Sequence, residues 1–222
     1  MAIVVIGGHS RSVGKTSVVA GLIAALRERE WTAIKLTQYG HGICSRDGQP
    51  CDCAVEDQEH SYAFTEEAER SGETDTSRFL LAGAQRALWV RTRQGNLAEA
   101  MPRLRRELAR AANVILESNS VIRFLQPDLY LVVLDPANPD FKPSAREFLD
   151  RADAAILDEP PAGALEMAPL WEGVSLQPIA GRPVFRVRPP QYVTPEIVAF
   201  VRERLQVTPT TETRRHREGF GI

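Results

Sequence analysis

A glycine-rich loop between a buried strand and a helix opens the sequence. Residues 2–6 read AIVVI, a continuous apolar run typical of a parallel strand that is covered on both faces. Residues 15–28 follow the loop with apolar side chains at helical spacing. The backbone N–H groups of such a loop and the N-terminus of the following helix attract an anion. This arrangement favours an α/β fold with an anion site at the carboxyl end of the first strand.

The loop reads GGHSRSVGKT over residues 7–16 and ends like a phosphate-binding loop, or P-loop. Gly14 permits close approach of the backbone to a phosphate, Lys15 supplies a positive charge, and the Thr16 hydroxyl is a ligand for Mg²⁺. In the pattern GxxxxGK(S/T) the first glycine is replaced here by His9, and Gly8 lies one position earlier. The residues predicted to bind the nucleotide are Gly8, Ser10, Arg11, Ser12, Val13, Gly14, Lys15, Thr16 and Ser17.

A P-loop needs a carboxylate near its Mg²⁺, and two candidates end apolar strand-like runs. These are Glu117 and Asp135. Glu117 is favoured because residues 118–120 (SNS) supply polar groups suited to a phosphate or metal edge. Thr16 and Glu117 are therefore the predicted Mg²⁺ ligands. The predicted catalytic residues are Lys15, Asp75 and Glu117, with Asp75 either holding the Mg²⁺ and its water or orienting the nucleophile.

Apolar strand-like runs alternate with helical segments along the rest of the chain. Such alternation predicts a three-layer α/β fold of the P-loop NTPase type, a mostly parallel sheet with helices on both faces. Further strands are expected at residues 31–36, 86–90, 113–116, 129–134, 154–157 and 183–187, and further helices at 76–82, 97–111, 141–152 and 195–205.

Several short motifs accompany the loop in a fixed order along the chain. They are Lys35 with Thr37, His41, Asp75–Thr76, Ala82–Gly83–Ala84 and Glu117. Over roughly residues 2–135 this order resembles the molybdopterin-guanine dinucleotide biosynthesis protein B family, GTP-binding P-loop proteins of the SIMIBI class. The resemblance implies a GTP site completed by a homodimer and a role in molybdenum cofactor biosynthesis.

The chain departs from the pattern of that family in three places. Ser118 replaces the glycine that follows the glutamate, and the region after Asp135 is longer. Residues 38–74, polar and weakly periodic, are predicted to be a functional insertion in a single domain spanning residues 1–207. Residues 208–222 are predicted to be a flexible tail.

All three cysteines of the chain lie in that predicted insertion. Together with His41 they offer four soft ligands: His41, Cys44, Cys51 and Cys53. A set of three Cys and one His is common in structural Zn²⁺ sites. Three thiolates could instead hold an iron–sulfur cluster, with a fourth ligand from a second chain. Transient metal carriage, redox sensing and three reduced cysteines without a metal are the other readings.

Charge and hydropathy exclude several classes of protein. The 222 residues carry a net charge of -2, which argues against nucleic-acid binding through bulk charge. The sequence has no apolar run long enough for a membrane span and no recognisable signal peptide. An odd number of clustered cysteines does not fit a secreted disulfide scaffold. A cytoplasmic protein without membrane or nucleic-acid partners is expected.

Three functions remain open on the sequence. The first is a Mg²⁺-dependent NTPase for GTP or ATP that assists a partner cofactor-biosynthesis enzyme or metalloenzyme. The second is a small-molecule kinase or ATP-dependent ligase of the dethiobiotin-synthetase type, with Lys35 and Ser118 at the acceptor. The third is a non-catalytic nucleotide-binding adaptor. Asp158–Glu159 is a candidate for contacts with the base, and Arg11 and Arg123 for contacts with phosphates.

Overall fold

The computed structural model describes residues 1–39, 61–159, 171 and 174–206. Eight strands form one sheet. They are β1 (Ile3–Gly8), β2 (Trp31–Tyr39), β3 (Tyr62–Glu66), β4 (Arg86–Arg93), β5 (Asn113–Glu117), β6 (Leu129–Leu134), β7 (Ala154–Asp158) and β8 (Val184–Val187). Their order is β3-β4-β2-β5-β1-β6-β7-β8. Among the described strands, β3 runs antiparallel to β4, and all remaining pairs of neighbouring strands are parallel.

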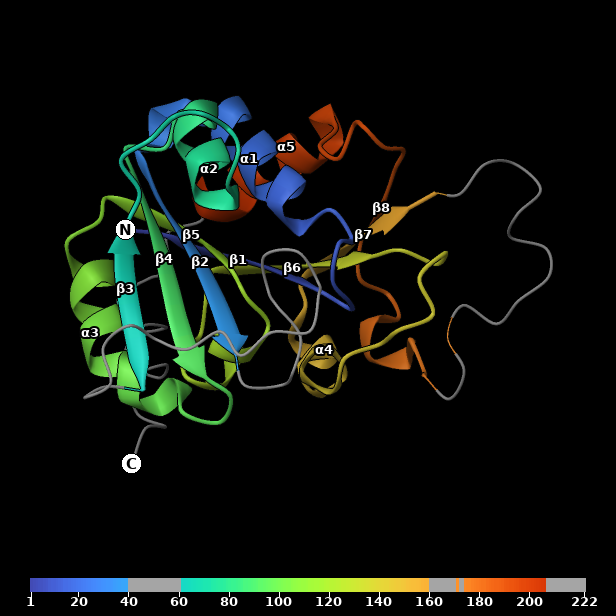
Figure 1. The fold of residues 1–222 in the computed structure, drawn as a ribbon. Helices are drawn as coiled ribbons and strands as arrows, with labels where there is room; N and C mark the ends of the chain where they lie inside the picture. The colour runs from blue at the N-terminus through green and yellow to red at the C-terminus, as the bar shows by residue number, and fades with distance from the viewer. Residues whose placement is uncertain (40–60, 160–170, 172–173, 207–222) are drawn as a thin grey trace.

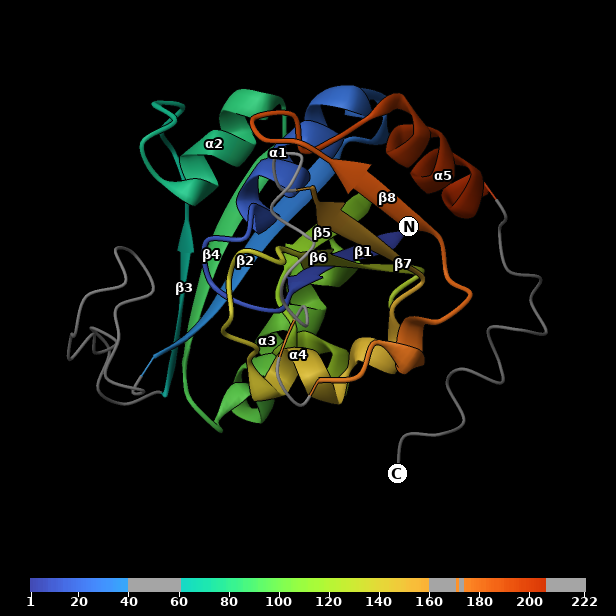
Figure 2. The ribbon, with the colours of Figure 1, turned by 90° about the vertical axis from the view of Figure 1, so that its right-hand side faces the viewer.

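Helices cover both faces of this sheet, which confirms the three-layer α/β prediction (Figures 1 and 2). The α-helices are α1 (Lys15–Ala25), α2 (Asp75–Ala82), α3 (Leu97–Ala109), α4 (Pro143–Glu147) and α5 (Pro195–Gln206). One buried core cluster joins the sheet to α1, α2 and α5, and a second joins it to α3 and to Phe148 and Leu149, which follow α4. All residues of β6 are buried, as expected for a strand packed on both faces.

The position of β1 in the sheet explains where the ligand site lies. Strands β5 and β6 flank β1. After β1 the chain first builds the strands on the β5 side of the sheet and later those on the β6 side. In open α/β sheets such a switch point forms a crevice at the carboxyl ends of the strands. The loop that follows β1 lies at this crevice.

Two stretches add detail to the sequence expectations. Of residues 38–74, predicted as a functional insertion, the described ends contribute the end of β2 and all of β3 to the sheet, and residues 40–60 lie outside the described residues. The helix expected over 141–152 is shorter: α4 ends at Glu147, and a separate 3-10 turn, Leu149–Arg151, follows it. None of the helices in the described ranges has the length and apolarity needed to cross a membrane.

Candidate functional site

The loop after β1 has the backbone of an anion-binding turn. Gly14, the residue before α1, has a φ of 89°, a left-handed conformation that strains any residue with a side chain. The Lys15 side chain curls back over the loop, and its Nζ donates a hydrogen bond to the Ser10 carbonyl at 2.6 Å. Burial lowers the pKa of Lys15. The loop therefore holds a partly buried cation at the N-terminus of α1, an arrangement that a bound anion stabilises.

His9 replaces the expected glycine because it anchors the loop to a distant segment. Its side chain is fully buried. Nε2 accepts a hydrogen bond from the Asp135 N–H at 3.0 Å, so the ring proton sits on Nδ1 and is donated to the Asp140 carbonyl at 2.7 Å. The ring also packs 4.8 Å from Trp171 and 5.2 Å from Phe141, between centroids. His9 therefore departs from the P-loop motif for a structural reason, because it fixes the loop to the segment from Asp135 to Asp140.

Replacing His9 with alanine is expected to lower the free energy of unfolding by about 3 kcal/mol, because two buried backbone groups lose their partners. Burial lowers the pKa of His9, so between its folded and unfolded values the unfolded chain binds more protons. In the native protein this contribution to stability is lost as the pH falls below about 6.5, and the variant should lack it.

Denaturant unfolding at neutral and acidic pH measures both effects. Phe141→Leu is the matched control, because it removes an aromatic contact with His9 and leaves the two hydrogen bonds intact. An equal loss of stability in both variants would show that packing, and not hydrogen bonding, fixes the loop.

Asn119, which follows β5, holds the other end of the loop. Its Oδ1 accepts from the Gly8 N–H and its Nδ2 donates to the Gly8 carbonyl, both at 2.8 Å. A Cβ on Gly7 would lie 2.3 Å from Asn119 Oδ1, so glycine is needed there. Sequence reasoning noted the polar run at 118–120 but did not assign this role. Ser118, a candidate for contact with a phosphoryl-acceptor substrate, accepts a hydrogen bond from the Val121 N–H at 3.3 Å.

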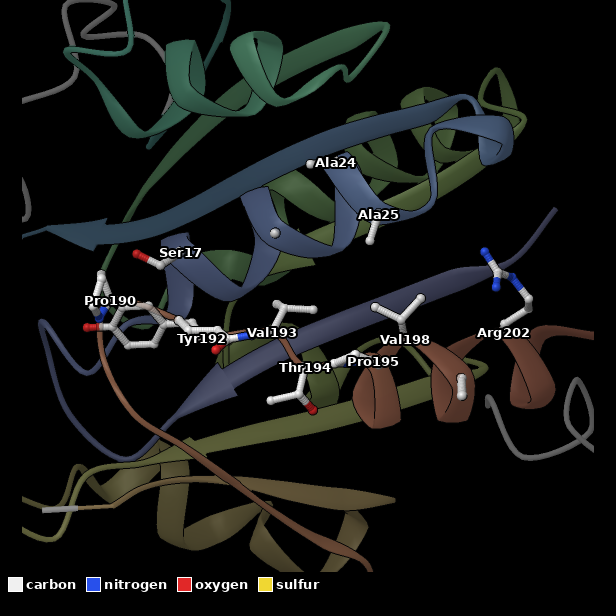
Figure 3. A pocket seen from close by; sticks show the side chains of 13 residues that line it. Ser17, Ala24, Ala25, Pro190, Tyr192, Val193, Thr194, Pro195, Val198 and Arg202 are labelled. Carbon is white, nitrogen blue, oxygen red and sulfur yellow. The ribbon is translucent and has the colours of Figure 1, made fainter.

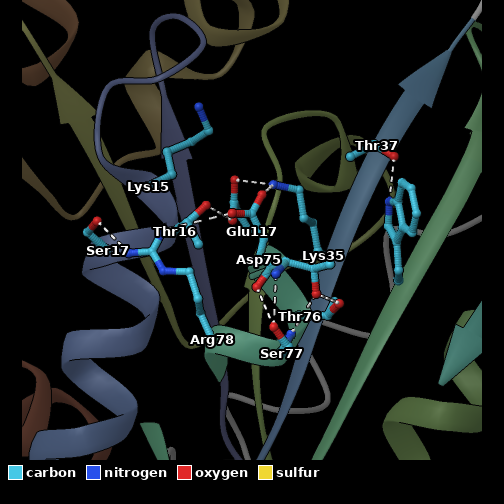
Figure 4. A network of polar contacts seen from close by, with 12 residues as sticks. Lys15, Thr16, Ser17, Lys35, Thr37, Asp75, Thr76, Ser77, Arg78 and Glu117 are labelled. Atoms are coloured by element: carbon cyan, nitrogen blue, oxygen red, sulfur yellow. Dashed lines mark hydrogen bonds and ion pairs between the residues drawn. The ribbon is translucent and has the colours of Figure 1, made fainter. Parts of the chain in front are cut away.

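The predicted Mg²⁺ ligands meet directly beneath the loop (Figure 4). Thr16 Oγ1 donates a hydrogen bond to Glu117 Oε2 at 2.8 Å, across the gap between α1 and β5. The other predicted carboxylate, Asp135, accepts the N–H of Ala137 at 2.9 Å. Of the two alternatives, Glu117 is the one that lies beside Thr16.

Lys35 joins two of the predicted catalytic carboxylates. It forms an ion pair with Asp75 at the start of α2, and its Nζ lies 3.4 Å from Glu117 Oε1. Burial alone would lower the pKa of Lys35, but the two carboxylates outweigh burial and raise it. On the far side of Asp75, Arg78 Nη2 donates to Ser17 Oγ at 3.1 Å, which links α2 to α1. Figure 4 shows these side chains converging between the two helices and β2.

A second lysine lies near Lys15 and was missed by sequence reasoning. Lys142 precedes α4, and its backbone N–H donates to the His9 carbonyl at 2.8 Å. Burial, with help from the charges of Lys15 and Arg11, lowers the pKa of Lys142 to about 7. A lysine whose pKa is lowered by burial and by neighbouring cations marks a site suited to a negative charge. Nothing near Lys142 in the sequence resembles a phosphate motif, so only the fold reveals it.

On the side of the loop away from Lys35, Tyr192 packs against the backbone of the loop. A Cβ on Gly14 would lie 2.2 Å from Tyr192 Cε1. Burial raises the pKa of Tyr192, and the charges of Asp158 and Asp135 raise it further. The ring stands at one end of a 750 Å³ groove between α1 and α5, beside Ser17, with Arg202 at the opposite end (Figure 3).

Of the two acidic residues predicted to contact the nucleotide base, Glu159 already forms ion pairs with two arginines. Its carboxylate lies 3.6 Å from Arg186 and 2.8 Å from Arg188. Burial raises the pKa of Asp158, and the neighbouring Asp135 raises it further. Asp158 therefore remains as the acidic candidate beside the loop.

Other sequence-predicted residues divide into those at the loop and those elsewhere. Ser10 donates to Asp140 Oδ2 at 2.6 Å, which fixes the loop a second time to the segment after β6. Arg123, predicted for phosphates, forms an ion pair with Glu147 at 2.6 Å. His41, Cys44, Cys51 and Cys53 lie outside the described residues. Within the described ranges, no group of three or more His, Cys, Asp or Glu side chains could hold a metal ion.

Three features define the fold as that of a P-loop NTPase. They are the central position of β1, the anion-binding loop that follows it, and the Thr16–Glu117 pair. No protein-family model matches the chain. No curated protein matches it either. The family resemblance seen in the sequence therefore stays a prediction.

Two solved structures are similar to this fold. The apo form of LpxK from Aquifex aeolicus in complex with ATP is 19% identical, with a TM-score of 0.45, over 84% of this chain and 53% of that one. The chain thus spans about half the length of LpxK. HypB from Helicobacter pylori in complex with nickel is 14% identical, with a TM-score of 0.45, over 96% of this chain and 87% of that one.

Proposed function

We propose that this protein binds GTP or ATP with Mg²⁺ and transfers the terminal phosphoryl group of the nucleotide. The observation that carries the proposal is the pair Thr16–Glu117, joined at 2.8 Å beneath a loop that holds Lys15. Mg²⁺ prefers oxygen ligands and is commonly held by one or two protein groups together with nucleotide phosphates. The hydroxyl and carboxylate present fit that requirement without a larger acidic cluster.

In this proposal each side chain of the site has a separate task. Loop amides, Lys15 and Lys142 neutralise phosphate charge, and Thr16 with Glu117 holds the metal that shields the transferred group. Lys35 holds Asp75 and Glu117 in place, so that Asp75 orients the nucleophile. Asp158 and Tyr192, on the opposite side of the loop, are proposed to meet the base.

The nature of the phosphoryl acceptor separates the three candidate functions. Steady Mg²⁺-dependent release of phosphate with no added acceptor supports an NTPase. Turnover that depends on a metabolite supports a kinase or ligase. Tight binding without turnover supports an adaptor. Calorimetric titration with GTP and ATP, with and without Mg²⁺, tests the shared premise, and failure to bind either nucleotide would sink the proposal.

Nucleotide binding is expected to take up a proton through Lys142. Its pKa of about 7 leaves most of these side chains neutral at pH 8, and an adjacent triphosphate favours the charged form. Affinity should therefore decline as the pH rises above 7. Calorimetry at pH 8 in two buffers of different ionisation enthalpy measures the uptake. Lys142→Met should abolish it, and unchanged uptake in that variant would assign the proton to another group.

The more specific part of the proposal is a role in molybdopterin-type cofactor biosynthesis, which rests on the family resemblance of the sequence, or in metalloenzyme maturation, which rests on the cysteines. Cys44, Cys51 and Cys53, with His41, are proposed to hold Zn²⁺ or an iron–sulfur cluster. A homodimer and a docking partner enzyme belong to this reading. What supports the metal site is that all three cysteines of the chain gather with His41 in one polar stretch of the sequence.

Metal analysis of anaerobically purified, tag-free protein is expected to find on the order of one metal site per chain. The double variant Cys51→Ser, Cys53→Ser should lose the metal and retain nucleotide binding, because the P-loop does not include these residues. Wild-type protein with less than about a tenth of an equivalent of metal would contradict the metal site.

A further inference from the structure

The sheet continues beyond the point where α2 begins, and its extension carries cationic and aromatic side chains. Lys35 pairs with Trp89 across β2 and β4, and Thr37 pairs with Arg91. Because alternate residues of a strand share a face, these four side chains lie on the face that α1 and α2 cover further back. All four are partly exposed. Figure 1 shows the ends of β2 and β4 running past α2.

Contacts around Arg91 fix its guanidinium in one orientation. Its Cζ lies 4.6 Å from the centroid of the Trp89 ring, and its Nη2 donates to Thr65 Oγ1 at 3.1 Å. Trp89 in turn is held by a hydrogen bond from its Nε1 to Thr37 Oγ1 at 2.9 Å. We call Thr37, Thr65, Trp89 and Arg91 the Arg91 platform. An orientation fixed in advance reduces the entropy that binding would cost.

The platform lacks a negative partner within the described part of the chain. No described carboxylate pairs with Arg91, and its buried Nε has no hydrogen-bond partner. A guanidinium carries five N–H donors and matches carboxylates and phosphates especially well. Asp75, an acid that lies further back on this face, is held by Lys35 and Arg78.

The distance from the platform to the phosphoryl site suits a small molecule. Arg91 lies two residues along and one strand across from Lys35, which places their Cα atoms roughly 8 Å apart. Lys35 contacts Asp75 and Glu117, the carboxylates assigned above to the nucleophile and the metal. A ligand anchored on Arg91 would therefore reach Asp75 with its opposite end.

We propose that the Arg91 platform binds the anionic end of a second substrate, a small phosphorylated or carboxylated metabolite that also carries a hydroxyl group. This inference rests on the proposed function and identifies the class of acceptor for it. The hydroxyl oxygen forms the new bond to the γ-phosphorus, and the bond from that phosphorus to the bridging oxygen breaks. A nucleoside diphosphate leaves, and the proton of the hydroxyl passes to Asp75.

The indole N–H signals of the full-length protein test the platform and the nucleotide loop separately. Trp89 belongs to the platform, whereas Trp171 packs 4.8 Å from His9 and reports on the loop. The ¹⁵N-labelled chain is first saturated with Mg²⁺ and a non-hydrolysable triphosphate analogue, so that the γ-phosphate position is filled. Inorganic phosphate is then titrated at constant ionic strength. Trp89→Phe assigns the signal of the platform.

We expect phosphate to shift the Trp89 signal saturably while the nucleotide remains bound. Arg91→Gln should raise the midpoint at least tenfold, and Arg105→Gln, an exposed arginine of α3, should not change it. Unchanged Trp31 and Trp171 signals would show that Arg91→Gln folds. A Trp89 signal that does not saturate, or one with the same midpoint in Arg91→Gln, would overturn the platform. If the Trp171 signal does not shift when the triphosphate analogue is added, the proposed function is contradicted instead.

Discussion

Replacing Lys15 with alanine is expected to weaken nucleotide binding about 100-fold, because charge-assisted hydrogen bonds to phosphate are among the strongest single contacts in a site. In the free protein Lys15 Nζ donates a hydrogen bond to the Ser10 carbonyl of its own loop, at 2.6 Å. Burial lowers its pKa, which shows that the charged side chain is poorly solvated before the ligand arrives. The variant should therefore lose function without losing stability.

Calorimetric titration and thermal unfolding check the two halves of this prediction. The melting temperature should be unchanged or higher, since a buried charge has been removed. Lys142→Ala is the matched control: it removes a lysine from the same surroundings, but binding should fall only about tenfold, because Lys142 precedes α4 and lies outside the P-loop. Equal losses in both variants would mean that the site senses total charge and not the geometry of the P-loop.

Glu117→Gln is expected to reduce Mg²⁺-dependent turnover about a thousandfold, because it removes the charge that holds the metal against the transferred group. Glutamine can still accept the hydrogen bond of Thr16 and fill the same space. Lys35 keeps Asp75 as a partner, so the loss of one carboxylate leaves no buried lysine unpaired. Nucleotide binding without Mg²⁺ should change little.

Asp135→Asn is the matched control for Glu117→Gln, because each residue lies at the carboxyl end of a strand that flanks β1. Asp135 faces the N–H of Ala137, and asparagine can make the same contact. Turnover as a function of Mg²⁺ concentration distinguishes the two variants. If Asp135→Asn loses turnover and Glu117→Gln keeps it, the metal lies on the other side of β1.

Much of the site could be predicted because it is local in the chain. The loop, Lys15 and Thr16 follow one another directly, and Glu117 ends an apolar strand that any parallel sheet would place at the same edge. Lys142 and Asn119 could not be placed this way. Their contacts with His9 and Gly8 depend on the register of β6 and β5 against β1, which no short motif encodes.

The fold was predictable where apolar runs are long and less so where they are short. Strand β3, Tyr62–Glu66, has only five residues and lies in a polar stretch, and its pairing with β4 makes it a strand. Helix α4 ends early even though apolar residues continue beyond it. Phe148 and Leu149 are buried in the core cluster beside α3, and this packing is satisfied by a 3-10 turn.

The anchoring of His9 has a consequence for how relatives of this chain can be recognised. A search pattern that demands glycine at the first position of the loop passes over it. The hydrogen bonds of His9 reach the backbone of Asp135 and Asp140, whose carboxylates bind the Ala137 N–H and the Ser10 hydroxyl, and the next charged residue, Lys142, faces the same loop. A two-part signature, histidine inside the loop and Asp-x4-Asp-x-Lys after a later strand, would therefore retrieve chains that share this architecture.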